Sequence, residues 1–460
     1  MNLPERNITA AFFAAICLAA AAVSPQQPVP GSWAYAEVPQ QTLPSDDAWW
    51  EAFEDPLLDS LISEAEDANY DVLGAMHRME AASRQIEAAR AAYFPTVGID
   101  ASYTRRREEG ISTNTYALGA TLNWEIDLFG KVRANVGRSR AAYRATRAEW
   151  VGTMVSMSAA MASAYIGLRT CQAELAVARE HIIRQDTIAG IARYRYECGL
   201  AAKGDVDQAL TVLYSTRATV PALETSARSY INAIALLLGV YPGDVAARLS
   251  AGRNIPHFYG PVVTGVPADL LRRRPDIVQA EATLDEAAAA LGIARKDYLP
   301  TLSVQASAGV SAPRPGDMFT SRGFYYSVAP TLSWTLFDGL ARRAGVEAAR
   351  ETLQAGVEAY NQAVMGAYCE VDNALVSYYN ILRQIAEYEA AVSSAADFLN
   401  QSLELYRQGL TEFVNVANAQ VDLLQFTNSL LVARGQASTA LVTLYKALGG
   451  GYDSLLADEN

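Results

Sequence analysis

The chain has 460 residues, a formal net charge of −13, 51% hydrophobic residues and 19% charged residues. This acidic balance excludes a typical nucleic-acid-binding protein, because such proteins neutralise phosphates with a basic surface. Beyond the N-terminus we expect no segment that is apolar for long enough to cross a bilayer as a helix, which excludes a helical membrane protein.

The N-terminus has the outline of a secretory signal. Arg6 precedes an apolar run that gives way to an extended Pro-rich leader. We assign residues 1–22 to a signal peptide and 23–46 to the leader. Cys17 lies inside the apolar run and is a candidate lipid-acceptor cysteine of a bacterial lipoprotein. Cleavage after the alanines at 20–22 is the alternative.

A helix is predicted to begin at Asp46, with Pro56 near its first turn. Apolar residues recur at helical spacing to about Ala92, and the tripeptide at 93–95 ends the helix. This predicts one helix ahead of the first strand.

Two strand pairs are predicted from the period-two alternation of apolar and small polar residues, at about 96–125 and about 301–335. Each strand has about ten residues, the length that a tilted strand needs to cross a bilayer. An ordinary half-buried hairpin shows the same alternation, so both readings stay open. The charged run at 105–109 is expected to be the solvated loop of the first pair.

A long helical hairpin follows each strand pair, at about 131–238 and about 341–448. The outgoing helix of each is free of proline for about 68 residues, or about 100 Å at 1.5 Å per residue. Helices of this length cannot bury their apolar stripe in a compact globule, so they need lateral neighbours along their whole length.

The two halves of the chain repeat each other at a nearly fixed offset. Trp124 and Trp334 lie 210 positions apart, as do the dipeptides at 199–200 and 409–410. A duplication of this length predicts one body built from two copies of the same unit. The two repeats and the tail that follows them are 47–255, 256–452 and 453–460.

Four amphipathic strands cannot close a membrane barrel, and an open edge in lipid leaves unpaired backbone groups. The smallest closed barrels have about eight strands, so several chains must contribute to one. Three chains would supply about twelve strands, together with a helical wall of about 100 Å. Such a tube is suited to conduction across a wide gap.

Several motifs match those of a known family. They are Trp49 through Pro56, Trp124 through Gly130, Leu270 through Ile277, Phe337 through Gly339, and Leu444 through Gly451. With these motifs the chain resembles outer-membrane factors of the TolC and OprM type, in the branch that serves tripartite efflux pumps. The match runs from about Trp49 to Tyr452.

The resemblance implies a mainly α-helical protein with membrane β structure. A long α-helical barrel would continue into a shared 12-stranded trimeric β-barrel, with a small mixed equatorial region. It also implies a homotrimer in outer-membrane lipid that extends into the periplasm and binds a periplasmic adaptor protein and an inner-membrane pump. Its function would be the passive conduction of drugs or other small toxic compounds to the exterior. Substrate, adaptor and pump identities belong to other proteins.

By the same resemblance, Gly199, Leu200, Gly409 and Leu410 form tips that bind the adaptor. A glycine at a helix C-terminus takes the left-handed conformation and leaves the next residue, here an apolar leucine, exposed. The alternative is that these glycines only cap their helices.

The resemblance also implies a gate near the tips. The family position for an acidic ring, nine residues after the second tip glycine, holds Asn418, and the arginine three residues later is replaced by Val421. Val414 matches an apolar constriction. A carboxylate repeated around a threefold axis would attract cations, whereas solvated residues beside a turn are the alternative. The carboxylates close enough to substitute are Asp205, Asp207, Glu412 and Asp422.

Catalytic and metal-binding patterns are missing from the sequence. The histidines at 77, 181 and 257 are isolated, and no phosphate-binding glycine loop follows a strand. The cysteines at 171, 198 and 369 are expected to be small buried hydrophobes on helices rather than disulfide partners. The arginines at 272–274 are expected in an equatorial loop whose Pro275 and Asp276 begin a helix.

We therefore expect no enzyme, no cofactor, no metal and no nucleic-acid partner. Two alternatives to the efflux duct stay open: a non-conducting coiled-coil scaffold of the cell envelope, and an exit duct for protein secretion.

Overall fold

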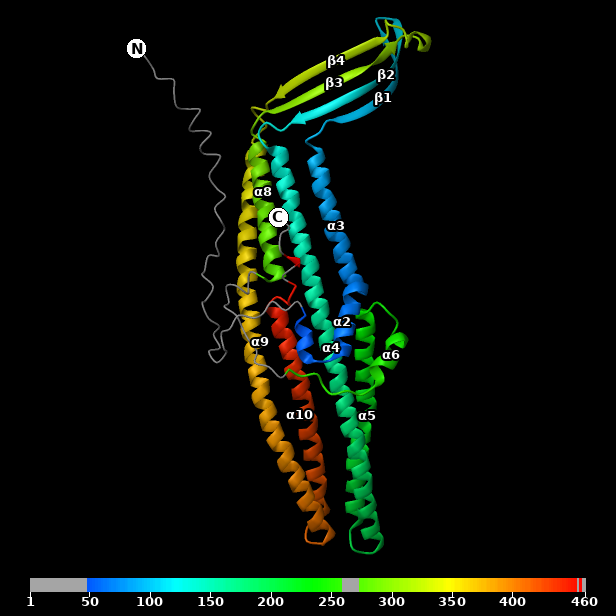
Figure 1. The fold of residues 1–460 in the computed structure, drawn as a ribbon, viewed down its shortest axis with the longest axis vertical. Helices are drawn as coiled ribbons and strands as arrows, with labels where there is room; N and C mark the ends of the chain where they lie inside the picture. Colours follow the sequence, from blue (N-terminus) through cyan, green and yellow to red (C-terminus); the bar gives the residue numbers. More distant parts are fainter. Residues whose placement is uncertain (1–47, 259–272, 453–454, 457–460) are drawn as a thin grey trace, which may run out of the picture.

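The computed structural model describes residues 48–258, 273–452 and 455–456. The molecule is a long rod with a four-stranded sheet at one end and the tips of two helical hairpins at the other (Figure 1). The predicted signal peptide, the Pro-rich leader, Cys17 and most of the predicted tail lie outside the described residues.

The prediction of one continuous helix before the first strand was wrong. Asp55 and Asn69 each interrupt it, because their side chains accept hydrogen bonds from backbone N–H groups of the helix that follows and so cap a new start. The three resulting pieces are the 3-10 helix η1 (Trp49–Phe53), α2 (Pro56–Ala68) and α3 (Tyr70–Ala91).

The sheet is antiparallel with the strand order β1-β2-β3-β4. Its register aligns Ile99, Ala120, Ala308 and Tyr326 on one face, and this face is apolar along the strands. The other face carries small and polar residues, because side chains alternate along a strand. The strands are β1 (Thr96–Glu108), β2 (Ile111–Ile126), β3 (Thr301–Ala312) and β4 (Phe324–Ser333).

The two strand hairpins end differently. The charged run at 105–109 is not the predicted loop, because β1 continues through most of it and only Glu109 and Gly110 turn the chain. Both have positive φ, 48° and 84°, as in the tight two-residue turns that match the twist of paired strands. The β3–β4 connection is longer and contains the 3-10 helix η2 (Pro315–Asp317) and Phe319, which is 79% exposed.

The helices form columns beneath the sheet. α4 and α9 each have 67 residues, which is about 100 Å of uninterrupted helix. Beside them, α3 lies above α5 and α8 lies above α10, so these columns consist of two stacked pieces (Figure 1). The bounds are α4 (Lys131–Glu197), α5 (Lys203–Leu237), α6 (Pro242–Ser250), α8 (Pro275–Lys296), α9 (Ala341–Arg407) and α10 (Phe413–Ala447).

The duplication holds at the level of single residues. The bounds of α3 and α8 differ by 205 positions, and those of α4 and α9 and of α5 and α10 differ by 210. The strand pairs share these offsets, since the pairing of Thr96 with Asn123 corresponds to that of Thr301 with Ser333. We call residues at these offsets equivalent.

Equivalent residues also fasten the stacked helices. At the α5–α3 joint, Asn69 donates a hydrogen bond from Nδ2 to the carbonyl oxygen of Leu237 at 2.8 Å. At the α10–α8 joint, its equivalent Arg274 donates from Nη1 to the carbonyl of Ala447 at 2.7 Å. Each donor occupies the N-cap position of the upper helix and satisfies a free carbonyl of the lower helix, and the Asn69 side chain also accepts hydrogen bonds from the first N–H groups of α3.

The buried Arg274 also binds two carboxylates, Asp276 at 2.7 Å and Glu370 on α9 at 2.6 Å. Burial alone would lower the pKa of the guanidinium, but hydrogen bonds with the two carboxylates outweigh burial and raise that pKa. α8 begins at Pro275. The ion pair between Arg274 and Glu370 therefore links the α10–α8 joint to α9.

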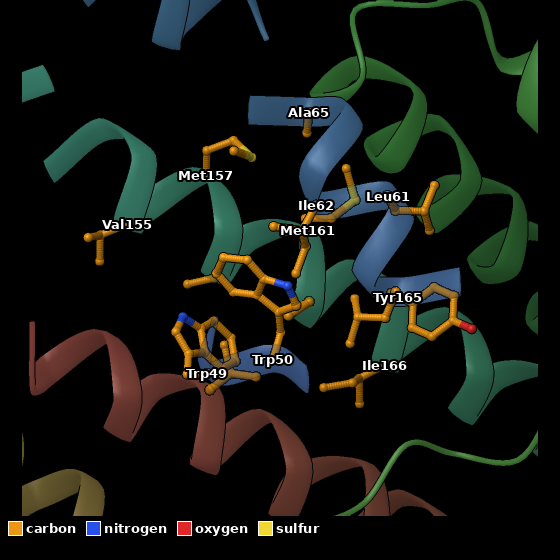
Figure 2. Close-up of a cluster of buried hydrophobic side chains, with 14 of the residues drawn as sticks. Trp49, Trp50, Leu61, Ile62, Ala65, Val155, Met157, Met161, Tyr165 and Ile166 are labelled. Carbon is orange, nitrogen blue, oxygen red and sulfur yellow. The ribbon is translucent and has the colours of Figure 1, made fainter. Parts of the chain in front are cut away.

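The largest core lies at mid-height, where η1 and α2 pack against α4 and α10 (Figure 2). Trp49 stacks on Tyr445 with ring centroids 5.4 Å apart. Tyr165 donates a hydrogen bond to Asp55 at 2.6 Å, and burial together with this bond raises the pKa of Tyr165 to about 12. These contacts anchor the equator of the molecule.

One sequence expectation about the membrane was wrong. α4 contains an 18-residue window with a mean hydropathy of 1.4, enough by length and composition to cross a bilayer. Because 61% of that window is buried inside the protein, it has the character of a core helix covered by its neighbours.

The cysteine expectation was correct only in part. Cys171, Cys198 and Cys369 are free thiols, and Cys171 is buried as expected. Cys198 and Cys369 are exposed, so they are not small core hydrophobes.

Candidate functional site at the helical tips

Both helical hairpins turn by the same backbone motif. Gly199 and Gly409 have φ of 72° and 76°, the left-handed region that favours glycine. The N–H of Leu200 bonds the carbonyl of Arg195 at 2.8 Å, and the N–H of Leu410 bonds the carbonyl of Leu405 at 2.9 Å. These bonds, with those of the glycines themselves, form Schellman motifs that satisfy the last carbonyls of each helix.

The motif leaves an apolar side chain in solvent at the end of each hairpin. Leu200 is 66% exposed and Leu410 is 70% exposed. Burying two such leucines against a partner would remove apolar surface from water, worth about 25 cal/mol per Å². The tips therefore present a repeated apolar contact.

A latch of three side chains joins the two hairpins just above the tips. Arg195 on α4 donates a hydrogen bond to the carbonyl of Arg407 at 3.0 Å, and its guanidinium lies 4.8 Å from the ring centroid of Tyr406. Tyr406 on α9 donates in turn to Oδ2 of Asp205 on α5 at 3.4 Å. We call Arg195, Tyr406 and Asp205 the latch.

The latch rests on an apolar cluster. Tyr406 packs edge-on against Phe413, with centroids 5.2 Å apart, and both are buried among Ile188, Ala192 and Val416. Burial, followed by the nearby Asp205 carboxylate, raises the pKa of Tyr406. The phenol therefore stays protonated and able to donate at neutral pH.

The structure brings one of the predicted gate carboxylates, Asp205, into this arrangement. Asp207, Glu412 and Asp422 are exposed within the protomer. On α10, the exposed residues Val414, Asn418, Val421 and Asp422 recur at helical spacing and so share one face. That face is mostly apolar or neutral.

Sequence reasoning missed Arg195 and Tyr406. Tyr406 is part of a tyrosine position that repeats, since its equivalent is Tyr196, but the equivalent of Arg195 is Leu405. This departure from the repeat was the available signal. Among the described residues, no group of three or more His, Cys, Asp or Glu side chains is placed to hold a metal ion.

The family model of outer membrane efflux proteins matches residues 61–240 and 266–450, one match in each repeat. Among similar proteins, nodulation protein T of Rhizobium leguminosarum bv. trifolii is 27% identical over 440 residues, which cover 93% of both chains. Outer membrane protein OprJ of Pseudomonas aeruginosa is 28% identical over 441 residues, covering 93% of this chain and 91% of OprJ.

Solved structures agree with these matches. The outer-membrane channel OprN superposes with a TM-score of 0.87 at 28% identity, over 93% of this chain and 99% of OprN. VceC of Vibrio cholerae superposes with a TM-score of 0.81 at 26% identity, over 89% of this chain and all of VceC (100%). The predicted fold class is confirmed by these likenesses, and the chain belongs to the family of outer membrane efflux proteins, with the outer membrane as its location.

Proposed function

We propose that three copies of this chain form one tube that conducts small toxic compounds passively from a periplasmic pump to the cell exterior. Each copy would supply four strands to a barrel and its helical columns to a wall of about 100 Å. Conduction through such a tube needs no catalytic group in the wall.

The observation that carries the proposal is the open sheet. β1 and β4 are the outer strands of the described sheet, so each has one unpaired edge. In lipid each unpaired N–H or C=O costs several kcal/mol, so the apolar face seen here requires closure by further strands. Similarity to outer-membrane channels supports the same reading.

The proposal extends to the tips, where Leu200 and Leu410 would contact a periplasmic adaptor. Their high exposure and their equivalence suit a partner that binds the same motif repeatedly around the tube. The TtgC relative from Pseudomonas putida, a probable efflux pump outer membrane protein at 27% identity, supports a pump partner.

The latch would hold the periplasmic end closed. Opening would separate the two hairpins, so it would have to break the hydrogen bond from Tyr406 to Asp205 and the contact of Arg195 with α9. Asp207, Glu412, Val414, Asn418 and Asp422 would lie near the narrowest part. In this assignment the three copies of Asn418 form an uncharged ring around the axis of the tube.

The first test is cell fractionation followed by the native mass of the detergent-extracted protein. An outer-membrane species of about three chain masses, which conducts ions in a planar bilayer, is the expected result. A monomer or dimer in the soluble periplasm would contradict the tube and favour the envelope scaffold. A conducting trimer that exports a protein rather than drugs would favour the secretion duct.

Docking is tested separately with Leu200→Asp and Leu410→Asp. A buried aspartate at an apolar contact costs several kcal/mol, so drug resistance should fall while the trimer persists. Phe319→Asp, at an exposed apolar residue in the β3–β4 connection far from the tips, is the control and should keep resistance. Full resistance in the tip variants would remove these leucines from the docking site.

A further inference from the structure

The apolar face of the sheet changes in character toward its free end. This end lies away from the helices, where β1 turns into β2 (Figure 1). Side chains alternate along a strand, so every second residue of β1 lies on this face. Apolar residues there give way to an aromatic ring and then to two guanidinium groups. The residues in order are Val97, Ile99, Ala101, Tyr103, Arg105 and Arg107.

The aromatic residues form a belt across the same face. Tyr103 pairs with Tyr116 of β2, and their ring centroids are 4.8 Å apart. On β4 the rings of Phe324 and Tyr326 lie 6.4 Å apart. In membrane barrels such belts flank the apolar band at the two interfaces with water. The belt therefore marks the height at which the hydrocarbon ends.

A tryptophan nearer the helices marks the other end of the band. Trp124 lies on the same face of β2 as Tyr116, eight positions away. This separation is about 27 Å along a strand. With the usual tilt of about 35–45° it covers about 20 Å of membrane, close to the apolar band of about 25 Å. Arg105, two residues beyond Tyr103, therefore lies at the height of the lipid headgroups.

The two arginines beyond the belt are surrounded by hydrogen-bond donors. Arg105 pairs with Asn114 of β2, and Arg107 pairs with Ser112. Both arginines are exposed, and neither forms an ion pair with any residue that the structure describes. The Tyr103 hydroxyl donates to Oδ1 of Asn114 at 3.3 Å, which leaves Nδ2 of Asn114 as a donor. We call these four residues, Arg105, Arg107, Ser112 and Asn114, the cationic patch.

The arginine between them behaves differently. Arg106 lies on the opposite, polar face of the sheet, because side chains alternate along the strand. There it forms an ion pair with Glu108 of the same strand at 3.3 Å. One strand therefore carries a neutralised cation on its polar face and two unneutralised cations on its apolar face.

The surroundings of the cationic patch define the ligand that it fits. Aliphatic and aromatic side chains lie toward the helices, and the patch itself lies beyond the apolar band. A molecule that contacts both must join acyl chains to an anionic headgroup. Guanidinium groups bind phosphate with two parallel hydrogen bonds, while their aliphatic stems lie along apolar surface. Arg105 and Arg107 are about 7 Å apart along the strand.

We propose that Arg105 and Arg107 bind phosphate groups of an anionic lipid in the outer leaflet of the outer membrane, with Asn114 and Ser112 as further donors. The helices extend into the periplasm, so the free end of the sheet reaches the outer leaflet. The inference rests on the proposed tube, which places the apolar face in lipid. It adds one lipid-headgroup site to each copy.

The test is the binding of bisphosphorylated lipid A to the detergent-extracted full chain, titrated in mixed micelles and followed by native mass spectrometry. The double variant Arg105→Gln with Arg107→Gln should raise the apparent dissociation constant about tenfold or more, because each arginine near an anionic surface contributes roughly fivefold. All variants should keep a native mass of three chains, since the patch lies outside the apolar band.

The matched control is Arg106→Gln. It removes the same charge from the same strand as Arg105→Gln but on the opposite face, so it should leave the dissociation constant close to that of the wild type. Two probes identify the ligand chemistry. Dephosphorylated lipid A should bind the wild type weakly, and inorganic phosphate should not displace bisphosphorylated lipid A.

An unchanged dissociation constant in the double variant would overturn the site. Equal weakening by Arg106→Gln and Arg105→Gln would also overturn it, because it would show a general effect of net charge. Displacement of lipid A by an equal concentration of inorganic phosphate would overturn the assignment to lipid. A three-chain species without preference for phosphorylated lipid A would overturn the site and leave the tube intact, whereas a native mass of one chain would defeat the tube itself.

Discussion

At the scale of single residues, His181 is a buried titratable group on α4, 7% exposed. Burial, and then the nearby Arg184, lowers its pKa below the ordinary 6.5. The folded protein therefore holds a neutral ring where the unfolded chain binds a proton. The associated stability is fully present above about pH 6.5 and is lost as the pH falls through the lowered pKa.

We expect His181→Gln to flatten this pH dependence. The thermal midpoint of the wild-type protein in detergent should fall between pH 7 and pH 5 by more than that of the variant, because glutamine takes up no proton. The exposed His77 provides the control, and His77→Gln should keep the wild-type slope. Parallel curves for wild type and His181→Gln would show that other groups dominate.

A pair of glycines shapes the sheet on its polar face. Gly119 and Gly309 oppose each other in β2 and β3, and Tyr325 of β4 pairs with Gly309. A methyl group built on Gly119 would lie 2.7 Å from the Tyr325 hydroxyl, and one on Gly309 would lie 2.4 Å from the carbonyl oxygen of Leu118. The tyrosine hydroxyl fills the space that a side chain at Gly119 would take, whereas neighbouring backbone fills that space at Gly309.

Two substitutions should therefore behave differently. Gly119→Ala should lower the thermal midpoint, and adding Tyr325→Phe should restore part of the loss by removing the hydroxyl. Gly309→Val should lower the free energy of unfolding by about 1–3 kcal/mol, the usual cost of overpacking. Tyr325→Phe should not restore this loss, because the valine side chain clashes with backbone atoms. Circular dichroism melting in detergent measures both, and equal rescue of the two would refute the assignment.

At the scale of elements, the two helix joints form a natural comparison. Asn69 fastens α3 to α5 with a neutral amide, whereas Arg274 fastens α8 to α10 and also pairs with Glu370 on α9. Because Glu370 is 63% exposed in its side chain, its ion pair is partly screened by solvent. The hydrogen bond to the Ala447 carbonyl is the better protected contact.

We expect Arg274→Ala to cost about 1–3 kcal/mol, since it leaves a buried carbonyl without a donor. Arg274→Asn, which copies the other joint, should recover part of that loss and make stability less sensitive to salt. Glu370→Gln is the control that removes the ion pair alone. Denaturant midpoints at low and high salt measure these effects. An Arg274→Ala midpoint equal to that of the wild type would show that Arg274 does not stabilise the α10–α8 joint.

At the scale of the whole molecule, the exposed face of α10 sets the expected selectivity of the proposed pore. Val414, Asn418 and Val421 give that face few charges. Asn418→Asp would place a carboxylate ring there and should raise the cation-to-anion permeability ratio several-fold, because such rings attract cations. Reversal potentials in a KCl gradient measure this permeability ratio. Lys203→Gln, which lies outside this face, is the control. An unchanged ratio in Asn418→Asp would place Asn418 off the conduction path.

Much of the fold was predictable because the chain repeats itself. The 210-residue offset between Trp124 and Trp334, and the proline-free stretches after them, lead directly to the strand pairs and the long helices. The break at Asn69 was not predictable, since a capping asparagine inside an amphipathic run resembles an exposed helical residue. The latch was equally hidden, because Tyr406 and Asp205 lie 201 positions apart and meet only through tertiary packing.

The unequal ends of the two strand hairpins have a consequence for how much sequence change each can accept. A two-residue turn at Glu109 and Gly110 has both residues at positive φ, so it has little freedom to change in length or sequence. The longer β3–β4 connection, which contains η2 and the exposed Phe319, has more room to vary or to accept an inserted epitope. Insertions and sequence changes should therefore be tolerated in one strand connection per copy, and sequence variation should concentrate there.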